Sequence, residues 1–156
     1  MILRPGDRAP DLSLPDHLGS VFTLTEAAPR AAVVLAFVPF AFSPICGDEL
    51  AALDGWQERM RQGSHAVDVI VVSTDSKYTL AAWAQQAGTA VILASDFWPH
   101  GGAARAFGVF DEIHGVAERG VFVISPAGTI VSGRQVTRTE TRDFSEDFAA
   151  ALSCLG

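Results

Sequence analysis

The residues with the clearest chemical potential surround Cys46, one of two cysteines in a chain of 156 residues. Ser43 is a typical helix N-cap, and Pro44 is a typical first helical residue. Cys46 is then expected in the first turn of a helix, where free backbone N–H groups and the helix dipole favour a thiolate, the nucleophilic form. Ser43 can cap this helix or hydrogen-bond the sulfur or a substrate oxygen. The pattern predicts a reactive cysteine, and the alternative is a small buried apolar cysteine.

Two apolar segments are expected to position this cysteine. The segment Ala31–Val38 is short, uninterrupted and rich in β-branched residues, which predicts a buried central strand. A helix reaching about Arg61 is predicted after Cys46, because apolar residues recur every three or four positions at Leu50, Leu53, Trp56 and Met60. Cys46 is therefore expected where a core strand ends and a helix begins.

The remaining elements alternate between strand and helix patterns, with a hairpin near each end. This order predicts an α/β domain in which helices cover a mixed sheet, without fixing the strand order. No repeat, linker or low-complexity tract divides the chain, so we expect residues 1–156 to form one domain. The predicted elements are a hairpin (11–14 with 21–24), strands at Val67–Ser73 and Val91–Leu93, a helix capped by Ser76 and ended by Gly88, a helix at 102–107, a strand or extended insertion at 109–118, a hairpin (120–124 with 129–131) and a helix at 143–155.

Composition and charge exclude several classes of protein. The net charge of −7 argues against general binding to nucleic acid or to anionic membranes. No signal-peptide core or membrane-length apolar run occurs, so a cytoplasmic protein is expected. The chain lacks a Cys-x-x-Cys pair, ligand spacing among His17, His65 and His114, and a glycine-rich phosphate loop. We therefore expect no metal and no cofactor.

The motif Pro39-x-x-x-Ser43-x-x-Cys46 resembles the active-site motif of the peroxiredoxins. Further segments match this family in the same order, at Ala9–Asp11, Ser95–Gly101 and Arg119–Ile124. The resemblance covers nearly the whole chain and is closest to the AhpE group of one-cysteine peroxiredoxins. It implies a thioredoxin-like fold with an added N-terminal β-hairpin. It also implies an antioxidant thiol peroxidase that reduces hydrogen peroxide and organic hydroperoxides without a cofactor.

The resemblance also implies roles for the motif residues. Cys46 would attack the peroxide and become a sulfenic acid, while Ser43 and the Cys46 backbone N–H bind the peroxide. Pro39 would shield the sulfur from water, although by itself it is a strand terminator. Arg119 would stabilise the thiolate and the developing charge. From its position alone, at the mouth of an apolar strand, Arg119 is either a group projecting from the end of the sheet or a surface charge.

Four further residues have two interpretations each. Glu49 either orients the arginine network, as the family pattern implies, or is a solvated helix carboxylate. Phe42 and Trp98 either line the pocket or a dimer contact, or are core residues. His100 either hydrogen-bonds near the site or is a structural histidine.

The fate of the sulfenic acid is left open by the sequence. The AhpE resemblance implies reduction by an external low-molecular-weight thiol or a glutaredoxin- or thioredoxin-like protein, which are mycothiol and mycoredoxin in that group. It also implies a homodimer. Cys154 is an alternative resolving thiol, at the end of an apolar helix face. A peroxide sensor that signals through oxidised Cys46, and a thioredoxin-fold binding module without redox chemistry, remain as other hypotheses.

Overall fold

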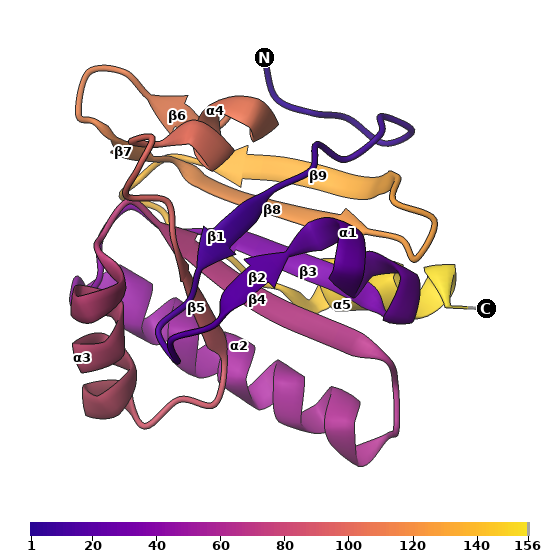
Figure 1. Ribbon diagram of the computed structural model, residues 1–156. Coiled ribbons are helices and arrows are strands. Elements are labelled where there is room, and N and C mark those ends of the chain that lie inside the picture. Colours follow the sequence, from indigo (N-terminus) through magenta and orange to yellow (C-terminus); the bar gives the residue numbers. More distant parts are fainter. Residues whose placement is uncertain (156) are drawn as a thin grey trace.

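The computed structural model describes residues 1–155, and its centre is a mixed five-stranded sheet (Figure 1). The strand order is β5-β4-β3-β8-β9. Strands β3 (Ala32–Phe37), β4 (Val67–Ser73) and β5 (Ile92–Ser95) are parallel, while β8 (Arg119–Ile124) and β9 (Ile130–Val136) run antiparallel to their neighbours. Every residue of β3 is buried, which explains its uninterrupted apolar sequence.

The two faces of the sheet are covered by different elements. Side chains alternate along β3, so Val34 and Ala36 join the cluster of α2 (Pro44–Gln62), α3 (Lys77–Ala87) and α5 (Ser145–Cys154). Leu35 and Phe37 point to the other face. That face is covered by β1 (Ser13–Pro15), β2 (Val21–Thr23), α1 (Leu24–Ala27) with the 3₁₀ turn η1 (Ala28–Arg30), and α4 (Gly102–Phe107). A short hairpin of β6 (Phe110–Asp111) and β7 (Val116–Ala117) precedes β8.

Local capping signals define the two longest helices. Ser43 caps α2 by accepting a hydrogen bond from the Cys46 N–H, and Ser76 caps α3 by accepting one from the Thr79 N–H. Gly88 ends α3 in the left-handed conformation, with a φ of 66°. These boundaries match those expected from the sequence because each depends on residues close together in the chain.

The predicted mixed sheet, flanking helices and N-terminal hairpin are confirmed, and three details differ. Leu24 begins α1 rather than continuing the hairpin strand. Residues 109–118 form the β6–β7 hairpin rather than a single strand. Strand β9 reaches Val136 and is longer than expected. The sequence did not reveal this length, because the residues of this edge strand are mostly half-buried and do not alternate between apolar and polar. Across residues 1–155, no helix has both the length and the apolar character needed to cross a membrane.

Candidate active site

Cys46 lies at the junction between the central strand and the first turn of α2. Its side chain has no exposed surface. Its backbone N–H, which the sequence analysis assigned to the peroxide, donates to Ser43 Oγ at 3.3 Å. Because a hydroxyl both donates and accepts, Ser43 keeps its own O–H free to donate to another atom. The structure thus places one donor hydroxyl within the first turn that holds the sulfur.

A buried ionic cluster of Glu49, Arg119 and Arg142 lies one helical turn along α2 from Cys46. Arg119 Nη1 donates to Glu49 Oε1, and Arg142 donates to both Glu49 oxygens at 2.7 and 2.9 Å. Arg142 also donates to the carbonyls of Phe37 and Gly120, at 2.9 and 2.7 Å. The three charged side chains are at most 2% exposed. The cluster ties α2 to the ends of β3 and β8.

Hydrogen bonds fix two sides of the Arg119 guanidinium and leave the third nitrogen available. Besides the bond to Glu49, Arg119 Nε donates to the carbonyl of Arg138 at 2.8 Å. Among the described residues, Nη2 of Arg119 has no acceptor. Since none of the fully buried side-chain nitrogen or oxygen atoms in residues 1–155 lacks a partner, Nη2 must touch solvent-accessible space. It is a free donor on a fixed cation.

The cluster carries an excess of positive charge. Two guanidinium groups face a single carboxylate, and charges buried this deeply are costly unless they are balanced. Cys46 and Glu49 are three residues apart on one helix, a spacing at which side chains are neighbours. An anion at the sulfur, either a thiolate or the charge that develops on a substrate oxygen, would complete this balance.

The other motif residues lie in the loop before α2 and in the loop after β5. Pro39 is buried directly after the central strand. Phe42 is 48% exposed, has a positive φ of 68°, and its ring centroid is 6.5 Å from that of Trp83 in α3. Trp98 is 79% exposed, so it is not a core residue. His100 donates from Nε2 to the Gly115 carbonyl at 2.6 Å, a contact that fits the structural interpretation of this histidine.

Asp75 connects these two loops. Its carboxylate accepts from the Ala41 N–H at 2.8 Å, and its carbonyl accepts from Ser95 Oγ at 2.6 Å. Ser95 Oγ in turn accepts from the Phe97 N–H at 3.3 Å. The exposed aromatic residues of both loops are therefore held on the same edge of the molecule.

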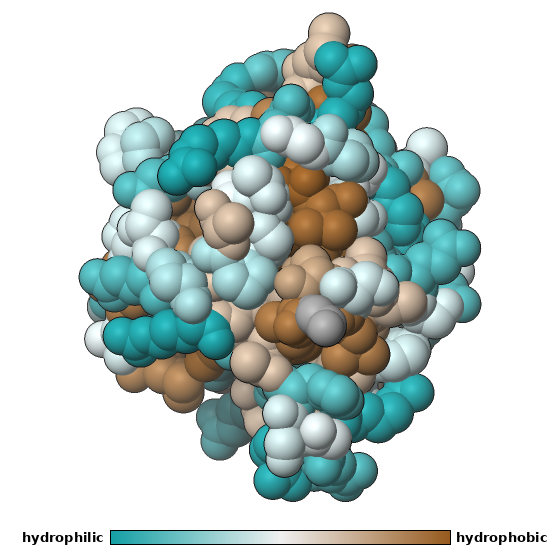
Figure 2. Space-filling view, turned by 90° about the vertical axis from the view of Figure 1, so that its right-hand side faces the viewer, coloured by the Kyte–Doolittle hydropathy of each residue, from teal (hydrophilic) through white to brown (hydrophobic). Residues whose placement is uncertain are grey.

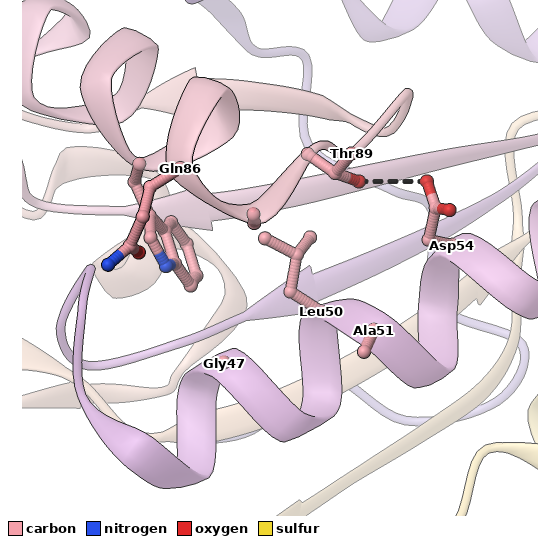
Figure 3. A pocket seen from close by; sticks show the side chains of 8 residues that line it. Gly47, Leu50, Ala51, Asp54, Gln86 and Thr89 are labelled. Carbon is pink, nitrogen blue, oxygen red and sulfur yellow. Dashed lines mark hydrogen bonds between the residues drawn. The ribbon is translucent and has the colours of Figure 1, made fainter.

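A groove of about 350 Å³ separates α2 from α3 on the side of α2 next to Cys46 (Figure 3). Figure 3 shows Leu50 pointing from α2 towards α3, and Thr89 donating to Asp54. None of the cluster residues Glu49, Arg119 and Arg142 lines it. The groove is lined by Gly47, Leu50, Ala51, Asp54, Trp83, Gln86, Ala87 and Thr89.

Cys154 lies at the far end of α5, away from the start of α2 (Figure 1). Helices α2 and α5 run in the same direction, because Arg142 contacts Glu49 and the Phe148 ring stacks on Trp56 with centroids 4.9 Å apart. Trp56 is already roughly 15 Å along α2 from Cys46, and Cys154 lies a further ~9 Å along α5, whereas a disulfide requires Cα atoms within ~7 Å.

The environment of Cys154 is apolar. Cys154 is partly buried and packs against the apolar cluster between the sheet and α2, α3 and α5. Figure 2, which views the molecule from the side where Figure 1 shows the C-terminus, has apolar side chains gathered on this face. The thiol donates to the Ala151 carbonyl at 3.1 Å, and burial raises the pKa of Cys154 above its ordinary value. This thiol is therefore less reactive than a free cysteine at neutral pH.

Two site residues were not identified from the sequence. Arg142 and Arg138 lie between β9 and α5, where threonines, a glutamate and arginines alternate without apolar periodicity. Such a segment resembles a solvated loop, and the contacts that bury Arg142 come from residues up to 105 positions away. No group of three or more His, Cys, Asp or Glu side chains within residues 1–155 has the geometry to hold a metal ion.

The structure brings together a capped cysteine at a helix start, a donor hydroxyl beside it and a buried arginine cluster, which is the arrangement that the resemblance to the peroxiredoxins implies. Residues 5–132 match the AhpC/TSA family, and the chain belongs to that family. It is a thiol-dependent peroxidase, an oxidoreductase of the peroxiredoxin class. The predicted family and the thioredoxin-like fold are thereby confirmed.

The similarity to individual relatives extends over most of the chain. Alkyl hydroperoxide reductase E of Mycobacterium tuberculosis is 36% identical over 142 residues, which cover 91% of this chain and 92% of that protein. The solved structure of Enterococcus faecalis AhpC superimposes with a TM-score of 0.84 at 28% identity, covering 99% of this chain and 93% of that one. The structure of peroxidoxin BcpB from Mycobacterium tuberculosis gives a TM-score of 0.81 at 26% identity, covering 96% and 95%.

Proposed function

We propose that this protein reduces hydrogen peroxide and organic hydroperoxides through a Cys46 thiolate. The observation that carries the proposal is the buried cluster of two arginines and one glutamate within a helical turn of the sulfur. Its excess positive charge favours a thiolate before the reaction and an oxyanion during it. An alkyl hydroperoxide reductase is among the relatives, which supports peroxides as the substrate class.

The proposed chemistry is a single displacement. The Cys46 thiolate attacks the nearer peroxide oxygen, an S–O bond forms and the O–O bond breaks. The departing oxygen leaves as hydroxide or alkoxide and takes a proton to become water or an alcohol. Ser43 Oγ–H and Arg119 Nη2 donate to the peroxide, and buried Pro39 limits the access of water. Cys46 ends as a sulfenic acid.

We propose that an external thiol restores Cys46. A low-molecular-weight thiol, or a glutaredoxin- or thioredoxin-like protein, attacks the sulfenic sulfur and releases water, leaving a mixed disulfide that a second thiol reduces. The position of Cys154 at the opposite end of α5, and its raised pKa, support this one-cysteine cycle over a Cys46–Cys154 disulfide. Because Cys46 has no exposed surface, the residues around it must shift for a peroxide or a reductant to reach the sulfur.

We also propose that the protein is a homodimer of single-domain chains. Large aromatic side chains that are usually buried are exposed on the two loops joined by Asp75, which suits a surface covered by a second copy. The exposed fractions are 44% for Phe40, 48% for Phe42, 54% for Phe97 and 79% for Trp98.

The test is to mix reduced protein with one equivalent of peroxide and to identify the product by mass spectrometry. Wild type and Cys154→Ser should each gain one oxygen, trapped as a dimedone adduct on Cys46, while Cys46→Ser should stay unchanged. A product that lacks two hydrogens and is lost in both variants would make Cys154 the resolving thiol. If Cys46 remains reduced under these conditions, the proposed peroxide chemistry is refuted.

A further inference from the structure

The carbonyl that holds Arg119 belongs to a segment without regular structure. Arg138 lies between the end of β9 at Val136 and the start of α5 at Ser145. No strand ladder fixes its carbonyl, which nevertheless accepts the hydrogen bond from Arg119 Nε at 2.8 Å. A guanidinium is planar, so the position of this acceptor sets the direction in which Nη2 points. Something else must fix the position of Arg138.

The side chain of Arg138 supplies that anchor by binding the turn of the β6–β7 hairpin. Arg138 Nε lies 3.4 Å from Asp111 Oδ2, and Nη2 lies 3.2 Å from His114 Nε2. His114 Nδ1 is 2.7 Å from the same Asp111 oxygen. One tautomer satisfies both contacts, since His114 donates from Nδ1 to Asp111 and accepts at Nε2 from Arg138.

The hairpin is itself held from the other side. The Gly115 carbonyl accepts from His100, and Arg105 forms an ion pair with Glu112. The Arg105 guanidinium also lies over the Phe110 ring, 4.1 Å from its centroid. The anchor of Arg138 is thus a fixed surface of the protein.

We propose that Arg138 is a positioning residue for peroxide reduction. Its side chain, bound to Asp111 and His114, holds its carbonyl against Arg119 and so aims Arg119 Nη2 at the substrate. Arg138 does not touch the reacting atoms and acts through Arg119. The inference rests on the proposed role of Arg119 in the reaction.

A double-mutant cycle tests this coupling, with the second-order rate of peroxide reduction measured by competition against a haem peroxidase. Arg138→Ala should lower this rate about tenfold, which corresponds to ~1.4 kcal/mol. In an Arg119→Ala background the same change should have no further effect. Arg138→Lys should recover part of the rate, because the single ammonium group can still reach Asp111 but cannot bind Asp111 and His114 at the same time.

Arg134→Ala is the matched control. Arg134 has nearly the same side-chain exposure, 32% against 31% for Arg138, and anchors the other end of the segment through Asp147 and the Asp143 carbonyl. It should leave the rate near wild type. If Arg138→Ala lowers the rate by the same factor with and without Arg119, the role of Arg138 is merely structural and the inference is overturned. The same holds if Arg134→Ala lowers the rate as much as Arg138→Ala does. An unchanged rate in Arg119→Ala would instead refute the proposed role of Arg119 itself.

Discussion

At the scale of single residues, Glu49 is the carboxylate that both buried arginines of the site bind. Both of its oxygens accept hydrogen bonds from buried arginines, and the side chain is 2% exposed. The sequence left two roles open for Glu49, a solvated carboxylate and an orienting group, and its burial excludes solvation. Arg142, its second partner, had no local signal, because an arginine in a polar segment looks the same whether its contacts are solvent or the distant Phe37 carbonyl.

The first prediction concerns this carboxylate. Glu49→Gln leaves two buried guanidinium groups without their counter-charge, so we expect it to lower the free energy of unfolding by about 3–5 kcal/mol. Urea denaturation followed by circular dichroism measures this change. Glu58→Gln is the control, because Glu58 pairs with Arg61 on the exposed side of the same helix. A loss in Glu49→Gln as small as that in Glu58→Gln would show that the buried cluster is not a stabilising unit.

At the scale of elements, the start of α2 combines a helix cap and a free donor hydroxyl in one side chain. Ser43 accepts from the Cys46 N–H and keeps a proton to donate. Helix starts such as Ser43-Pro44 and Ser76 were predictable because a cap is formed by residues within one turn. The β6–β7 hairpin was not, because its strands have two residues each and show no periodicity.

The second prediction separates the two functions of Ser43. Ser43→Ala should destabilise the protein by about 1 kcal/mol, whereas Ser43→Gly should lose only a few tenths, because glycine is tolerated at a cap. Both variants lack the hydroxyl, so both should reduce peroxide more slowly than wild type. Thermal unfolding and the peroxide rate are measured together. Ser76→Ala, which removes the cap of α3, should lose stability but keep the rate. A wild-type rate in Ser43→Gly would remove the hydroxyl from the mechanism.

At the scale of the whole molecule, the sheet and its two covering layers follow from the alternation along β3, which the sequence predicted as a buried strand. The sequence did not fix the order of the strands, because periodicity shows which residues are buried and not which strands are neighbours. It also left Phe42 and Trp98 between core and surface, since an aromatic residue in a loop has no period that reveals its exposure.

The third prediction concerns assembly. If the aromatic loops joined by Asp75 are covered by a second copy, light scattering should give wild type twice the mass of one chain. Trp98→Ser should shift it towards the monomer, since large central aromatic residues contribute most to interface stability. Leu18→Ser is the control, because Leu18 is 66% exposed on the β1–β2 turn. A monomeric wild type at high micromolar concentration would refute the proposed dimer.

The three tryptophans of the chain occupy three different environments, and this distribution has an optical consequence. Trp83 is 1% exposed and lies against Phe42, the residue before the helix cap of the active site. Trp56 is stacked on Phe148 beneath Arg59, roughly 15 Å along α2 from Cys46, and Trp98 is open to solvent. The intrinsic fluorescence can therefore be assigned by location. A shift of the loop that carries Phe42 would change the emission of Trp83, and the proposed contact between copies would change that of Trp98. With single-tryptophan variants, the proposed oxidation and assembly could be followed as separate signals without an attached dye.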